Sequence, residues 1–109
     1  MKMTIAPLIL AAAALMLAAG SPADTKAATD TVQIDNFSFT PQTLTIRAGT
    51  KVTWVNKDDV PHTVTSSEKK FKSRVLDTDD QFSYTFSNPG TYNYYCSVHP
   101  HMTGKIIVQ

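Results

Sequence analysis

Apolar and polar residues alternate along most of the chain after residue 30, with the period of two that is typical of half-buried β-strands. Val32 and Ile34 alternate with polar neighbours, and the spacing continues through Phe37 and Phe39. Turn residues such as Asn88-Pro89-Gly90 interrupt it. Similar short stretches are 43–47, 51–54, 63–66, 82–87, 91–96 and 105–108. The pattern predicts seven or eight short strands.

No stretch of ten or more residues after residue 30 has the apolar spacing of a helix. Residues 67–80 are the least periodic part, and we expect irregular structure there. Many short strands separated by turns favour a two-sheet antiparallel sandwich, with the alternate apolar side chains filling the space between the sheets. The predicted fold class is therefore an all-β, Greek-key β-sandwich.

The first residues of the chain follow a different pattern. Lys2 is followed by an almost wholly apolar stretch over 5–19, and small residues continue to Ala23. This predicts a cleavable signal peptide over 1–23 and hence an exported protein, most simply one of the bacterial periplasm. The stretch is shorter than the ~20 residues of a membrane-spanning helix, although a retained anchor is the alternative. Residues 24–30 are small and polar, which predicts a flexible linker. The remaining residues, 31–109, are predicted to form one domain.

Cys96 is the only cysteine, so no disulfide can form within the chain. An unpaired cysteine in a small exported protein needs an explanation, and a bound metal ion is one. The formal net charge is only +1, so the chain lacks the excess of basic residues that is typical of a nucleic-acid-binding protein. A local basic cluster (Lys69, Lys70, Lys72 and Arg74) is either a solvated loop face or a docking patch for a redox partner.

Three potential metal ligands have the spacing Cys96-x2-His99-x2-Met102, and His62 follows a proline far upstream. Thiolate, imidazole and thioether ligands together favour copper over zinc, and two imidazoles, one thiolate and a weak axial thioether are the blue-copper set. One cysteine is too few for an iron–sulfur cluster. We expect Cys96 at the end of one strand and Met102 at the start of the next, so that the loop brings the ligands together. Each residue alone has an ordinary structural role, but the combination predicts a copper site.

The same residues resemble the cupredoxin family, the plastocyanin, amicyanin and pseudoazurin group. The resemblance covers about 32–108 and is carried by 49–56, 60–64, 89–96 and a Cys-x2-His-Pro-x-Met loop similar to that of amicyanin. It implies eight strands and one type 1 copper ion that cycles between Cu(I) and Cu(II). It also implies His62, Cys96 and His99 as equatorial ligands, Met102 as the axial ligand, and an electron exit through His99.

The function implied by the resemblance is one-electron transport by a soluble monomer, between redox proteins such as a c-type cytochrome or a periplasmic dehydrogenase. Copper storage or delivery is the alternative. It is less favoured because Met102 is the only methionine outside the predicted signal peptide. An oxidase with several copper sites would need more than the three histidines of the chain, so no enzymatic activity is expected.

Two residues depart from the family pattern. Many relatives have an asparagine that ties the two copper loops together, and Thr63 stands in its place. Thr63 can also form hydrogen bonds, but its fit must differ. His101 occupies a position where amicyanin has an aromatic residue. It is either a solvent-facing loop residue or a pH-dependent charge beside a docking surface.

Overall fold

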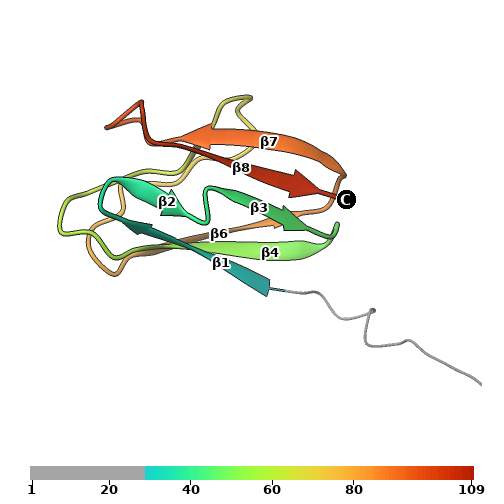
Figure 1. Cartoon of the computed structure of the whole chain (residues 1–109), viewed down its shortest axis with the longest axis horizontal. Helices are drawn as coiled ribbons and strands as arrows, with labels where there is room; N and C mark the ends of the chain where they lie inside the picture. Colours follow the sequence, from blue (N-terminus) through green and yellow to red (C-terminus); the bar gives the residue numbers. More distant parts are fainter. Residues whose placement is uncertain (1–28) are drawn as a thin grey trace, which may run out of the picture.

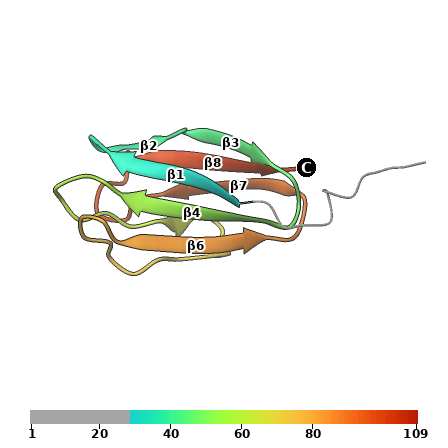
Figure 2. The same cartoon turned by 90° about the horizontal axis from the view of Figure 1, so that it is seen from below.

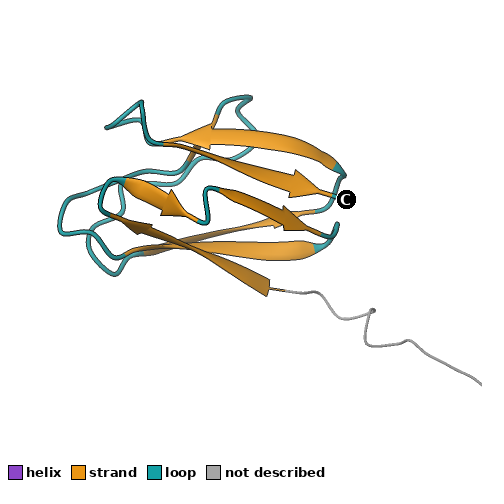
Figure 3. Cartoon of the chain, in the orientation of Figure 1, coloured by secondary structure: helices purple, strands orange, loops and turns teal. Residues whose placement is uncertain are grey.

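The computed structural model describes residues 29–109, which form two four-stranded β-sheets packed face to face (Figures 1 and 3). One sheet has the order β2-β1-β4-β6, with the strands Ser38–Thr40, Thr29–Asp35, Thr50–Asn56 and Gln81–Phe86. The other has the order β3-β8-β7-β5, with the strands Thr43–Ile46, Thr103–Val108, Gly90–Tyr95 and Thr65–Ser66. The prediction of an all-β sandwich of seven or eight strands is confirmed, and the number is eight.

The predicted signal peptide (1–23) and most of the predicted linker (24–30) lie outside the described residues. β1 begins at Thr29, so the last two residues of that linker belong to a strand. Between residues 29 and 109 there is no helix that could cross a membrane.

Each sheet contains one parallel pair of strands, which corrects the expectation of a purely antiparallel sandwich. β1 runs parallel to β4, and β3 runs parallel to β8. The other four pairs, β1–β2, β4–β6, β5–β7 and β7–β8, are antiparallel. The period of two is common to both kinds of pairing, so the alternation of residues could not distinguish them.

The core lies between the sheets and is built from the alternate residues of the strands. Val32 and Ile34 of β1 and Val52 and Trp54 of β4 have no exposed surface. The Trp54 ring contacts the rings of Phe71, Phe82, Phe86 and Tyr94, with centroids 5.3 to 6.3 Å apart. Burial of each large apolar side chain contributes about 1.5–3 kcal/mol, so this layer fixes how the sheets are aligned.

The turn between β1 and β2 interrupts the expected alternation. Asn36 and Phe37 have φ values of 51° and 56°, in the left-handed region that few residues other than glycine adopt. Phe39 is buried as predicted, but Phe37 is 50% exposed. A continuous strand through 36–39 was therefore the wrong prediction, because the turn rotates Phe37 out of the core.

β1, β4 and β7 all point toward the same end of the sandwich, opposite the C-terminus, as the two views in Figures 1 and 2 agree. Segment 67–80 is irregular, as expected, and is joined to the preceding residues by two isolated bridges, His62 to Leu76 and Thr65 to Lys72. The Asn56 side-chain amide, at the end of β4, donates hydrogen bonds to the carbonyl oxygens of Val60 and Leu76. These bonds shape the loop that carries His62.

Candidate metal centre

Three of the four predicted ligands meet at this end of the sandwich. The Sγ atom of Cys96 lies 3.7 Å from Nδ1 of His62 and 3.8 Å from Nδ1 of His99. All three donor atoms lie within 4.8 Å of one another. His62 and Cys96 have no exposed surface, whereas His99 is half-buried. The fold therefore brings together residues separated by more than thirty positions in the chain.

These separations fit a bound metal ion. First-row metal ions bind sulfur at about 2.3 Å and imidazole nitrogen at about 2.0 Å, so two such ligands at a trigonal angle stand about 3.7 Å apart. The observed sulfur–nitrogen distances of 3.7 and 3.8 Å match this value. A thiolate and two imidazoles, with a methionine close by, favour copper, because soft ligands select it. The residues present thus fit a type 1 copper ion.

The loop 96–102 is held in shape by its own backbone. The Cys96 carbonyl accepts the His99 N–H at 3.1 Å, and the His99 carbonyl accepts the Met102 N–H at 2.8 Å. The Cys96 N–H in turn donates to the Met102 carbonyl at 3.0 Å. Met102 is 6% exposed and belongs to the same buried cluster as Cys96. β7 ends at Tyr95 and β8 begins at Thr103, so Cys96 and Met102 each lie one residue outside the strand in which they were expected.

Asp58 orients His62 from the opposite side of the ring. Its Oδ2 atom lies 2.9 Å from Nε2 of His62 and also accepts the N–H of Phe37 at 3.0 Å. The Phe37 N–H, and after it the bond to His62, lower the pKa of Asp58 to about 2. The ionised carboxylate can only accept, so the proton of His62 belongs on Nε2 and Nδ1 is free to bind a metal ion.

Asp58 was not recognised as a functional residue from the sequence, where it stood in a run of polar loop residues. Its side chain is in fact buried, with 7% of the residue exposed. The only sequence signal was an acidic residue four positions before His62. That signal is weak, because acidic residues are common in loops.

Thr63 connects the two ligand loops directly. Its N–H donates to Sγ of Cys96 at 3.3 Å. Its Oγ1 atom accepts the Ser97 N–H at 2.8 Å and also lies within hydrogen-bond distance of the hydroxyl groups of Ser97, at 2.8 Å, and Thr65, at 3.2 Å. Threonine thus links the loops through its hydroxyl group.

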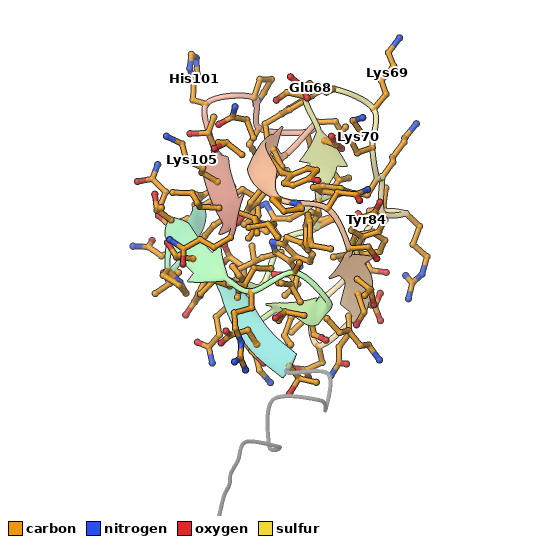
Figure 4. All side chains as sticks on the ribbon, turned by 90° about the vertical axis from the view of Figure 1, so that its right-hand side faces the viewer. Glu68, Lys69, Lys70, Tyr84, His101 and Lys105 are labelled. Carbon is orange, nitrogen blue, oxygen red and sulfur yellow. The ribbon has the colours of Figure 1, made fainter. Side chains whose placement is uncertain are left out.

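Two exposed apolar residues, Phe37 and Val98, lie beside the half-buried His99, and we call them the apolar rim. The Phe37 ring stands edge-on to both imidazoles, with centroids 5.6 Å from His62 and 5.1 Å from His99. Phe37 and Val98 are each 50% exposed. His101 is exposed and projects into solvent (Figure 4). His99 is therefore the most exposed of the three donor residues.

The comparisons with known proteins agree with this centre. The family model described as the cupredoxin-like domain matches residues 7–108. Amicyanin of Paracoccus versutus is 35% identical over 92 residues, covering 80% of this chain and 70% of that protein. The solved structure of a purple cupredoxin from Nitrosopumilus maritimus aligns with a TM-score of 0.70 at 35% identity, covering 73% of this chain and 99% of the other.

One structural neighbour is an enzyme. A copper-containing nitrite reductase from Thermus scotoductus aligns with a TM-score of 0.70 at 34% identity, over 74% of this chain but only 22% of the enzyme. The likeness is thus to one part of a larger protein. With the sandwich, the converging His, Cys and His ligands and the matches over most of its length, the chain belongs to the cupredoxin family.

Proposed function

We propose that the protein is a one-electron carrier, and that His62, Cys96 and His99 would hold its copper ion, with Met102 as a weaker fourth ligand. The observation that carries this proposal is the assembly of the three donor atoms at metal-bridging distances by hydrogen-bonded loops. A centre already in position rearranges little when its charge changes, and a small rearrangement makes electron transfer fast. When bound there, copper would supply the redox chemistry, as the Cu(I)/Cu(II) couple.

Burial of the ligands favours electron transport over copper delivery. Transfer of an ion to another protein requires incoming ligands to replace the existing ones. His62 and Cys96 have no exposed surface, and only the His99 side of the centre reaches solvent. Electrons can pass through that imidazole, whereas a new ligand would have to enter a closed site. The apolar rim formed by Phe37 and Val98 suits contact with a redox protein such as a c-type cytochrome or a dehydrogenase.

The number of metal sites favours a carrier over an enzyme. Residues 29–109 contain one group of His, Cys, Asp and Glu side chains that could hold a metal ion, and it is the group at Cys96. A copper enzyme such as a reductase needs a second place where substrate binds. We further propose that the N-terminal residues 1–23 direct export, because their apolar pattern is that of a signal peptide.

Comparison of two rates, that of electron transfer and that of copper loss, tests the proposal. The copper-loaded protein is mixed in one experiment with a small oxidant or reductant, and in another with a strong Cu(I) chelator. For a carrier we expect a reversible change of one electron per copper within milliseconds, and copper loss over hours. Rapid loss of copper to the chelator, with slow or irreversible electron transfer, would instead support delivery.

A further inference from the structure

A basic turn, residues 66–72, lies at the edge of the second sheet and has no part in the centre described above. Lys69, Lys70 and Lys72 are exposed, and Glu68 is the only acidic residue in the turn. Between residues 29 and 109 these lysines form no ion pair. Lys57 and Arg74, by contrast, pair with Asp79 and Asp80. The turn therefore presents positive charge that the described part of the chain does not neutralise.

The backbone of the basic turn is fixed. The Ser66 hydroxyl accepts the N–H groups of Glu68, at 3.2 Å, and of Lys70, at 3.0 Å. The Ser66 N–H donates to the Phe71 carbonyl at 2.9 Å, and the Phe71 side chain is buried against Trp54. The lysines therefore extend from a rigid support, which lowers the entropy lost when a partner binds.

Lys69 occupies an unfavourable backbone conformation. Its φ of 62° lies in the left-handed region, which glycine or asparagine adopts more readily. A strained residue of this kind, on the surface and without an ion pair, suggests that the side chain itself has a use. Its charge and its exposure leave the side chain available to a binding partner.

A hollow of about 510 Å³ adjoins the turn. Lys69 and Lys72 line one side of it, and Tyr95 and Ser97 line the other. Tyr95 and Ser97 are the two chain neighbours of Cys96. A protein seated on this hollow, on the β5–β7 edge, would contact both chain neighbours of the buried Cys96. Figure 4 shows the side chains of Glu68, Lys69 and Lys70 extending outward above this sheet.

We propose that the basic turn and the hollow beside it form a docking surface for an acidic redox protein. This inference rests on the proposed electron-carrier function. Complementary charge raises association rates by roughly 10- to 1,000-fold at low ionic strength, and salt removes the advantage. The basic turn supplies the charge and the hollow the point of contact, so this face adds a second approach to the copper besides the apolar rim at His99.

The first test uses a redox-inert anion and needs no electron transfer. The reduced, copper-loaded protein is titrated with paramagnetic hexacyanochromate(III), and broadening of the backbone amide signals is followed by NMR. We expect broadening at residues 66–72 and 95–97, and its loss in the double variant Lys69→Gln/Lys72→Gln. The matched control Lys51→Gln/Lys105→Gln removes two exposed lysines elsewhere and should leave the broadening in place. Broadening confined to the His99 rim, or none, would overturn the proposal.

The second test measures electron transfer with an acidic c-type cytochrome as the probe. At low ionic strength we expect Lys69→Gln/Lys72→Gln to lower the second-order rate constant about tenfold, and the control variant to change it less than twofold. The difference should disappear at high salt. Equal rate constants for the two variants would contradict docking at this turn. If all three proteins accept one electron per copper, that failure leaves the carrier function intact.

Discussion

The Nε2 atom of His62 lies 2.9 Å from the Oδ2 atom of Asp58, and both residues are buried. The same oxygen accepts the N–H of Phe37, so one carboxylate joins the β1–β2 turn to His62, the proposed metal ligand. The bond settles which ring nitrogen carries the proton. It therefore prepares His62 to bind copper through Nδ1, the atom that faces Cys96.

Replacement of Asp58 by asparagine should weaken copper binding. The amide cannot hold the imidazole through a charged hydrogen bond, and loss of such an outer partner typically lowers metal affinity about 10- to 100-fold. Competition with a calibrated copper chelator measures the change. Asp59→Asn is the matched control, because Asp59 is exposed and its side chain forms no hydrogen bond to His62. Equal affinities of the two variants would show that Asp58 does not position the ligand.

Asp58 should also make the metal-free protein less stable in acid. Its pKa is about 2 when folded, below the ordinary 3.8, so ionisation favours the folded state. The contribution is fully present above about pH 4 and is lost as the pH falls toward about 2. Urea unfolding at a series of pH values should show a shallower decline between about pH 4 and 2 for Asp58→Asn than for the unchanged protein. If the free energy of unfolding fell equally steeply in both proteins over that interval, the lowered pKa of Asp58 would be contradicted.

Removal of the Thr63 hydroxyl should loosen the link between the ligand loops. Thr63→Val keeps the shape of the side chain but leaves the Ser97 N–H without its acceptor, and we expect a loss of about 1–2 kcal/mol in the free energy of unfolding. Thr65→Val is the control, because its hydroxyl bonds only to that of Thr63. Chemical denaturation of the two variants provides the comparison. A larger loss of stability in Thr65→Val than in Thr63→Val would show that the Thr63 hydroxyl is not the main link between the two ligand loops.

Gly104 should not tolerate a side chain. A Cβ atom there would collide with the ring of Tyr94, which pairs with Gly104 directly across β7 and β8. Because Tyr94 is buried, the ring has nowhere to move, and Gly104→Ala should cost about 1–3 kcal/mol of stability. In a Tyr94→Leu background the same substitution should cost much less. An unchanged cost in that background would mean that the ring is not the obstacle.

The sequence was most informative where one face of a strand is buried. Val32, Ile34, Val52 and Trp54 all occupy the core positions that their alternation predicted. The spacing of Cys96, His99 and Met102 likewise predicted a copper site, because copper chemistry restricts which residues can be combined, and the donor atoms of Cys96 and His99 do lie together with that of His62. The alternation is a local property of each strand, and the copper prediction depends on the types of the ligand residues.

Other features depend on contacts between distant segments and could not be predicted in this way. Phe37 follows the strand pattern, yet its N–H bonds to Asp58, 21 residues away, and its ring leaves the core for the edge of the metal centre. Asp58 itself looked like an ordinary loop residue. The parallel pairing of β1 with β4 was hidden for the same reason, since strand direction leaves no trace in the alternation.

The most direct test of the copper centre is the absorption spectrum of the copper-loaded protein beside that of Cys96→Ser. A thiolate bound to Cu(II) gives an intense visible charge-transfer band and a blue or purple colour, and a serine oxygen cannot produce it. We expect the band in the unchanged protein, its loss on one-electron reduction, and its absence in the variant. A copper-loaded protein without the band, or a variant that keeps it, would contradict a metal centre built on Cys96.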